Sequence, residues 1–174
     1  MGVWMFRKAG PVAALALLLA GTPGIAKNVQ VAPGDPPITA EVPNGWATTR
    51  IDRGIQIKSA DEEVYLWFET YAPASFDAVM GEHRKYFAGQ GVKIVGAAKT
   101  STETYPALSV ELTDFPAEWQ GKPTLMRYIL LQPNNPLKKR ILASYWASPE
   151  GDKTHDGAMT RLMESFRESI AAAN

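Results

Sequence analysis

The segment VYLWFETYA, residues 64–72, constrains the fold more strongly than any other part of the chain. Successive side chains of a β-strand point to opposite faces, and here both faces are apolar: Val64, Leu66 and Phe68 on one, Tyr65, Trp67 and Tyr71 on the other. Residues 125–131 have the same two-sided apolar character. A strand that is apolar on both faces needs cover on both sides. We therefore expect a central sheet that lies between two outer layers.

The other periodic segments supply the rest of the sheet and two helices. Alternation predicts further strands at residues 38–42, 47–51, 54–59, 92–100 with a continuation near 104, 106–115, 124–133 and 139–148, with 116–123 as a loop and the last two strands as a hairpin. Helical spacing predicts one helix of about 14 residues with Ser75 as its N-cap. It predicts a second helix from about Lys153 to Ala172, capped by Asp152 or Thr154.

The order of these elements indicates the fold class. A run of antiparallel strands with helices packed on it is an α+β arrangement. We expect a single domain over residues 38–172, with a central antiparallel sheet of about six or seven strands in an α/β/α sandwich.

The N-terminal region has the pattern of a secretory signal peptide. Arg7 and Lys8 precede an apolar run at residues 9–21, which is shorter than the roughly 20 residues that span a bilayer. We predict a signal peptide over residues 1–26, cleaved after Ala26, with an uncleaved anchor as the alternative. Cleavage would leave no membrane span and a periplasmic or secreted protein. Residues 27–37, KNVQVAPGDPP, would then form an extended, poorly packed lead-in.

Charge balance and the lack of cysteine exclude several classes of function. Basic and acidic residues number 18 each, so the chain has no broad positive charge for nucleic acid, and no nucleic-acid partner is expected. Without cysteine there is no thiol nucleophile, zinc-thiolate site, disulfide framework or lipid-modified N-terminal cysteine. Gly-rich phosphate-binding loops are absent from the sequence as well, and we expect neither a cofactor nor a bound metal.

His83 is the main candidate for acid–base chemistry near neutral pH. It lies on the apolar stripe of the first predicted helix, next to Glu82, and Glu69 in the preceding strand can lie near it in space. One hypothesis is a hydrolytic enzyme that uses His83 with a carboxylate. The alternative is a histidine at the boundary between helix and sheet that is satisfied by hydrogen bonding.

Two other polar groups have simpler interpretations. His155, between Asp152 and Asp156, is typical of a polar helix cap, because no further metal ligands are grouped with it. Residues 61–63, DEE, carry the oxygen ligands that a hard cation prefers, but they are more typical of a solvated turn.

Aromatic side chains are the more informative surplus. Tyr65 and Trp67 share one strand face, which Tyr128, and Tyr145 or Trp146, can join across the sheet. These residues either line a pocket for a small apolar ligand, anchor a protein partner, or form core beneath a helix.

Two predicted loops carry further candidate contacts. Trp119 and Gln120 lie in the predicted loop 116–123, where the tryptophan either marks an exposed contact site or closes one end of the sheet. Lys138, Lys139 and Arg140 gather at a hairpin tip, where they either meet an acidic partner or keep a strand edge soluble.

Residues 42–46, VPNGW, predict a turn after the first strand of the domain. Trp46 follows that turn directly, and we expect it to plug the rim of the sheet as a core residue. The segment is thus a feature of the fold rather than a functional loop.

The element order, with the segments VPNGW, SFDAVM, TYPALSVEL, RYILL and ESF, resembles the PsbP-like domains. That fold is shared with a Ran-binding Mog-type nuclear import factor and with DcrB-like exported bacterial proteins. The resemblance implies a protein that binds partners or assembles into complexes, with no shared catalytic residue to assign. We therefore expect a small exported, non-catalytic binding or accessory domain of the bacterial cell envelope. The alternatives are the His83 hydrolase and an immunity or chaperone protein for a secreted toxin.

Overall fold

The computed structural model describes residues 26–135 and 138–173. The predicted signal peptide therefore lies outside the described residues, except for Ala26. Among the described helices, none is long and apolar enough to cross a membrane.

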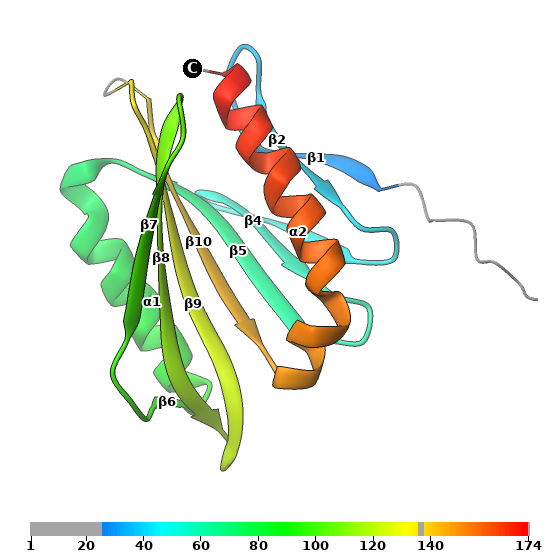
Figure 1. Cartoon of the computed structure of the whole chain (residues 1–174), viewed down its shortest axis with the longest axis vertical. Helices are drawn as coiled ribbons and strands as arrows, with labels where there is room; N and C mark the ends of the chain where they lie inside the picture. The colour runs from blue at the N-terminus through cyan, green and yellow to red at the C-terminus, as the bar shows by residue number, and fades with distance from the viewer. Residues whose placement is uncertain (1–25, 136–137, 174) are drawn as a thin grey trace, which may run out of the picture.

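A large antiparallel sheet forms the centre of the molecule (Figure 1). Its order is β3-β4-β5-β10-β9-β8-β6, and β7 also pairs with β8, which gives eight strands where the sequence predicts six or seven. The bounds are β3 Ala47–Ile51, β4 Gly54–Lys58, β5 Val64–Tyr71, β6 Val92–Ile94, β7 Lys99–Thr104, β8 Leu108–Trp119, β9 Lys122–Pro133 and β10 Arg140–Ala147. The additional strand arises because the segment predicted as one strand from residue 92 is divided into β6 and β7.

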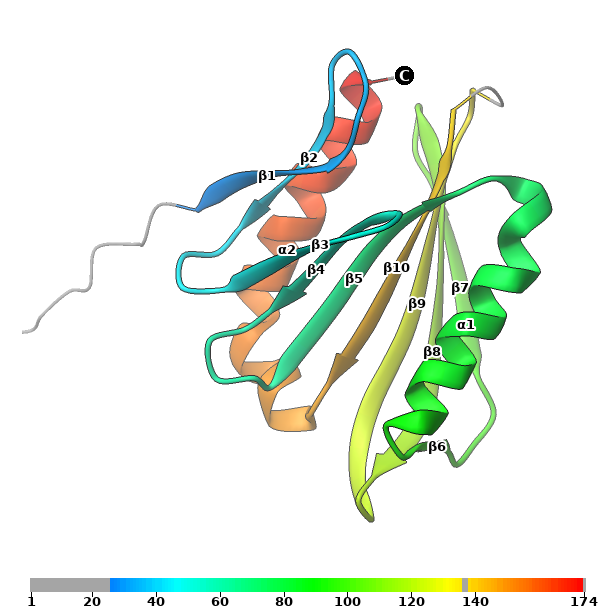
Figure 2. The same cartoon turned by 180° about the vertical axis from the view of Figure 1, so that it is seen from behind.

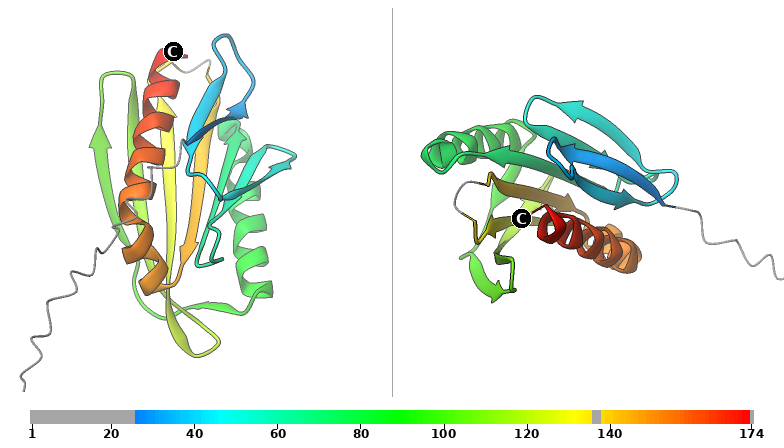
Figure 3. Two further views of the ribbon diagram at one scale, coloured as in Figure 1. Left: turned by 90° about the vertical axis from the view of Figure 1, so that its right-hand side faces the viewer. Right: turned by 90° about the horizontal axis from the view of Figure 1, so that it is seen from above.

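Both faces of this sheet are covered, as the two-sided apolar strands predict. Helix α1 (Phe76–Gly89), which follows the short 3-10 turn η1 (Pro73–Ser75), lies on one face (Figure 2). Helix α2 (Pro149–Ala172) lies on the other face beside a small hairpin of β1 (Lys27–Ala32) and β2 (Ile38–Val42) (Figure 3). The prediction of an α+β fold with helices on either side of an antiparallel sheet is confirmed.

The β1–β2 hairpin corrects the expectation of a poorly packed lead-in. Residues 27–32 are extended, but they pair with β2, and Val31 is fully buried in the core on the α2 side. The second edge of β2 is held by α2. Ser169 Oγ accepts the backbone N–H of Thr39 at 2.8 Å, and Ser165 Oγ accepts that of Glu41 at 2.9 Å. Helix serines thus take the place of a neighbouring strand.

The larger of the two core clusters lies between the sheet and α2. The ring of Phe166 packs on that of Phe68 with their centroids 4.3 Å apart, and Leu162 and Ile170 are fully buried beside them. Trp46 belongs to this cluster and is 6% exposed, with its ring edge-on to His155 at 5.2 Å. The turn before Trp46 has Gly45 at φ +82° and closes with a hydrogen bond from Trp46 N–H to the carbonyl of Pro43.

The first helix starts where the sequence predicts, whereas the second starts earlier. Ser75 precedes α1, but its hydroxyl donates to the carbonyl of Ala72 and caps no helical N–H. Helix α2 begins at Pro149, four residues before Lys153, and its cap is Ser148, whose Oγ accepts the N–H of Gly151. Proline suits the first turn of a helix because a backbone N–H at that position has no partner within the helix.

The prediction of a loop at residues 116–123 is wrong. Strands β8 and β9 continue through it and meet at a tight turn formed by Gln120 and Gly121, which have φ of +52° and +74°. Two positive φ values match the twist that a two-residue hairpin needs. The result is a long hairpin with Trp119 at its tip.

Candidate functional site

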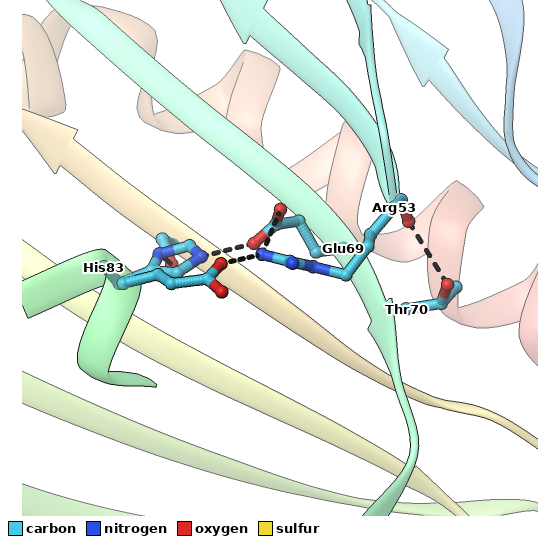
Figure 4. Close-up of polar contacts among 6 residues, drawn as sticks. Arg53, Glu69, Thr70 and His83 are labelled. Atoms are coloured by element: carbon cyan, nitrogen blue, oxygen red, sulfur yellow. Dashed lines mark hydrogen bonds and ion pairs between the residues drawn. The ribbon is translucent and has the colours of Figure 1, made fainter. Parts of the chain in front are cut away.

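A cluster of polar side chains lies between α1 and the middle of the sheet (Figure 4). His83 comes from α1, Glu69 from β5, Ser144 from β10 and Arg53 from the turn between β3 and β4. The core around them is otherwise apolar, since the alternation of β5 and β10 turns Trp67, Leu142 and Trp146 toward the same helix. The sequence thus places a small polar group inside an apolar layer.

The members of this cluster are connected in one series of hydrogen bonds. His83 Nε2 bonds to one carboxylate oxygen of Glu69, and His83 Nδ1 lies 2.7 Å from Ser144 Oγ. The guanidinium of Arg53 contacts the other Glu69 oxygen at 3.2 Å and Glu82 at 2.6 Å. The backbone carbonyl of Arg53 in turn accepts the N–H of Thr70 at 2.9 Å, which holds the turn against β5. Figure 4 shows His83 and Arg53 both directed at the Glu69 carboxylate.

Electrostatics favour the ionised form of Glu69. Burial alone would raise the pKa of this carboxyl, but the hydrogen bond from His83 and the charges of His83 and Arg53 outweigh burial and hold it below the ordinary value of 4.5. The charged form of Arg53 is favoured as well, because its hydrogen bond to Glu82 raises the pKa of the guanidinium against the opposing effect of burial. The cluster is therefore a compensated ion pair network rather than an isolated buried charge.

The series serine, histidine, carboxylate has the residue types of a hydrolase triad, but its accessibility does not suit catalysis. Ser144 is 0% exposed, and Glu69 and His83 are 6% and 8% exposed. A cavity of about 490 Å³ adjoins His83, Arg53 and Glu82, yet within the described chain neither serine nor threonine lines it. Both ring nitrogens of His83 already have partners, so neither is available to a substrate. The geometry fits a contact that fastens α1 to the sheet.

Most of the predicted aromatic face is core beneath α1. Trp67 and Tyr128 are buried in the cluster on that side, and burial raises the pKa of Tyr128 to about 12. Trp146 rather than Tyr145 joins them, because Tyr145 faces α2. Tyr65 is the exception: it packs against the margin of this cluster, is only half-buried, and lies at the start of β5, at the end of the sheet where Trp146 ends β10.

An open groove lies at that end, and we call it the aromatic groove. Tyr65, Tyr86, Trp119 and Trp146 line it, and its volume is about 900 Å³. Trp119 is 38% exposed and Tyr86 45% exposed. The indole N–H of Trp119 donates to the carbonyl of Gln90 at the end of α1, and its ring stands edge-on to Trp146 at 5.4 Å. Trp119 thus closes the end of the sheet and also presents apolar surface to solvent. The two interpretations of this residue from the sequence are therefore compatible with each other.

The predicted basic contact lies elsewhere. Lys138 and Lys139 are exposed and precede β10, whereas Trp119 ends β8 next to the start of β9. The length of β9 separates them, about 35 Å at the usual rise of a strand. Lys138 Nζ donates to the carbonyl of Ala173 at the end of α2, and Arg140 opposes Tyr71 in the sheet. The two sets of predicted contact residues therefore do not form one surface, and Gln120 belongs to the Trp119 end.

The remaining polar candidates have structural partners. His155 Nε2 lies 2.8 Å from Asp61, which links the start of α2 to the turn before β5. The hydrogen bond from Ser59, followed by that from His155, lowers the pKa of Asp61 to about 2. No group of three or more histidine, aspartate or glutamate side chains in the described ranges is arranged to hold a metal ion.

Sequence reasoning missed Arg53, Ser144 and Tyr86. Ser144 had a usable signal, because it is the one hydroxyl among the α1-facing residues of β10, between Leu142 and Trp146. Arg53 gave none, since a charged residue before Gly54 is ordinary in a turn. Tyr86 lies off the buried stripe of α1, where exposed and half-covered aromatics look alike in sequence.

Comparison with known proteins gives a likeness in structure only. No family model and no curated protein matches the sequence. The solution structure of cyanobacterial PsbP (CyanoP) from Synechocystis sp. PCC 6803 aligns with a TM-score of 0.53 at 13% identity, over 86% of this chain and 96% of that one. A Pseudomonas aeruginosa protein of unknown function, PA94, aligns with a TM-score of 0.36 at 10% identity, over 78% and 93% of the two chains. The alignment covers nearly the whole length of CyanoP. The fold of this chain, an antiparallel sheet covered on both faces, is therefore PsbP-like.

Proposed function

We propose that the chain is an exported accessory domain of the bacterial cell envelope that binds a protein partner through the aromatic groove. The basic and then apolar N-terminal residues support export. The PsbP-like fold supports a binding or accessory role, in line with what the family resemblance implies.

The observation that carries the proposal is the exposure of large aromatics around a concave surface. Tyr86 and Trp119 contribute apolar area from two different elements, α1 and the tip of the β8–β9 hairpin. Tyrosine and tryptophan supply much of the binding energy in protein interfaces because they bury large areas with little loss of conformational entropy. The volume of about 900 Å³ also accommodates a small apolar ligand, which is the alternative occupant.

A hydrolytic function has less support. The histidine and carboxylate on which it depends are joined to each other and to Ser144 beneath α1, with no reachable nucleophile beside them. We therefore assign the His83 cluster to stability and the aromatic groove to binding.

The test is affinity purification from an envelope extract of the source organism, with the chain from Lys27 onward as bait. We compare wild type with a Tyr86→Ala, Trp119→Ala double variant, and with a Lys138→Ala, Lys139→Ala variant as the matched control at the other end of the sheet. Mass spectrometry identifies bound proteins and extracted small molecules. We expect one partner that the groove variant loses and the control keeps, and a toxin as that partner would assign an immunity role. Loss in the control alone, or equal recovery in all three, contradicts the proposal.

Export has its own test. The protein isolated from the envelope fraction should begin at Lys27 when its N-terminus is sequenced. A protein that begins at Met1 in the cytoplasmic fraction would contradict the proposed location without affecting the groove.

A further inference from the structure

Strand β7 forms an open edge of the main sheet. All six of its residues are exposed, and within the described part of the chain it pairs with β8 and with no other strand. In Figure 3 it lies at the outer side of the sheet. It contains neither proline nor a bulge, two of the features that keep a strand edge from pairing.

The register of β7 shows which of its backbone groups point outward. Tyr105 N–H donates to the carbonyl of Leu108, and the same register continues through Thr104↔Ser109 to Lys99↔Asp114. Residues whose backbone bonds to the partner alternate with residues whose backbone points away. Counting from Tyr105, the N–H and C=O groups of Thr100, Thr102 and Thr104 therefore point to the open edge.

We propose that this edge pairs with the same edge of a second copy of the chain, antiparallel, with the two-fold axis at Ser101. In that register Lys99 of each copy lies opposite Glu103 of the other, which forms two opposite-charge pairs. Thr100 of each copy lies opposite Thr102 of the other, so their outward backbone groups bond to one another. The two sheets would then join into one. This inference does not depend on the function proposed for the aromatic groove.

The sequence of β7 selects this register over its neighbours. A shift of one residue brings outward groups of one copy against inward groups of the other, and the ladder is lost. A shift of two residues moves the axis to Thr100 or Thr102 and separates both Lys99 and Glu103 from their opposites. Lys99, Ser101 and Glu103 share the sheet face of Asp114, Leu112 and Val110. Side chains directly opposite on one face of an antiparallel pair lie close enough to interact.

The interface between two paired β7 edges is small, so the association should be weak and dependent on concentration. Charged side chains on an edge also serve to keep strands apart, and a monomer at every concentration is the outcome that this reading predicts. The two hypotheses predict different effects of exchanging the charges at Lys99 and Glu103. Only in the dimer do opposite charges at two-fold related positions attract and like charges repel.

The test is sedimentation equilibrium of the chain from Lys27 onward, which contains every element of the described fold, in low salt over a wide concentration range. We expect a dimer for wild type, and a dissociation constant raised about tenfold or more by Lys99→Glu alone or Glu103→Lys alone. The Lys99→Glu, Glu103→Lys double variant should restore dimerisation to near the wild-type value. Circular dichroism should show unchanged folding, since both side chains are exposed.

A second variant checks the backbone. Thr102→Pro removes an outward N–H without removing a bond to β8, and it should abolish the dimer while the monomer keeps its melting temperature. A monomeric wild type, a double charge variant that fails to restore association, or a dimer that survives Thr102→Pro would each overturn the proposal.

Discussion

The imidazole of His83 on α1 bonds to the carboxylate of Glu69 on β5, and the pair is buried where the helix crosses the middle of the sheet. Ser144 occupies the other ring nitrogen of His83, and Arg53 occupies the other oxygen of Glu69. Because each group satisfies the next, removal of one leaves a buried polar atom without its partner. This explains why a titratable pair persists in an otherwise apolar layer.

Replacement of His83 by alanine should lower the free energy of unfolding by about 3 kcal/mol, because it leaves Glu69 and Ser144 buried with fewer partners. Urea denaturation measures the change. Arg84→Ala, on the exposed side of the same helix, is the matched control and should have little effect. A loss below about 1 kcal/mol for His83→Ala would show that the cluster contributes little to stability.

Acid should destabilise the protein partly through Glu69. Its pKa is lowered in the folded state, so its stabilising contribution is complete above the ordinary carboxyl value of 4.5 and declines as the pH falls through the lowered folded value. Glu69→Gln should therefore reduce stability at neutral pH and flatten the loss of stability below about pH 4.5.

Urea titrations at a series of pH values from 7 to 3 compare wild type with Glu69→Gln. Asp61, whose pKa is lowered to about 2, is present in both proteins and cancels in the difference. Glu118→Gln, at an exposed position of β8, is the control. Parallel pH curves for wild type and Glu69→Gln would contradict the assignment.

Trp46→Ala should cost about 3 to 5 kcal/mol, because a large buried aromatic leaves a cavity that the surroundings fill only in part. The melting temperature measures this effect. Trp46→Phe keeps much of the volume and should cost less. An unchanged melting temperature in Trp46→Ala would return the segment VPNGW to the functional candidates.

The serines of α2 should each protect one amide of β2. Ser169→Ala removes the acceptor of Thr39 N–H, and Ser165→Ala that of Glu41 N–H, at a cost of about 1 kcal/mol each. Hydrogen exchange followed by NMR should show faster exchange at Thr39 in the first variant and at Glu41 in the second. Equal acceleration of both amides in either variant would mean that the hairpin moves as a unit instead.

Alternation along β5 and β9 was sufficient to predict the layered fold, because two apolar faces allow few other arrangements. The same reasoning failed at Pro116 and Pro123, which argue against strands but lie in β8 and β9. Pro116 lies opposite Leu125, and Pro123 lies opposite Glu118. Counted from the Gln120–Gly121 turn, both are non-hydrogen-bonded pairs, so neither proline needs an N–H for the pairing of β8 with β9. Local composition does not reveal that pairing.

The candidate site was harder to predict than the fold. The sequence allowed Glu69 to lie near His83, but the connection of this pair to Arg53 and Ser144 depends on which residues the sheet order brings together. Trp119 was predicted as a candidate contact residue, whereas Tyr86 was not, since the two line one groove only because the end of α1 lies against the tip of the β8–β9 hairpin. Contacts between elements distant in sequence require the topology.

Site-specific photo-crosslinking tests the binding proposal most directly. A photoreactive phenylalanine analogue placed at Tyr86, in the aromatic groove, is compared with one at Lys139, at the other end of the sheet, in cells of the source organism. We predict one dominant crosslinked protein from position 86 that is lost when Trp119→Ala is added, and none of it from position 139. Crosslinks to that protein from position 139, or an unchanged yield from position 86 in the Trp119→Ala background, would contradict the assignment of the aromatic groove as the binding surface.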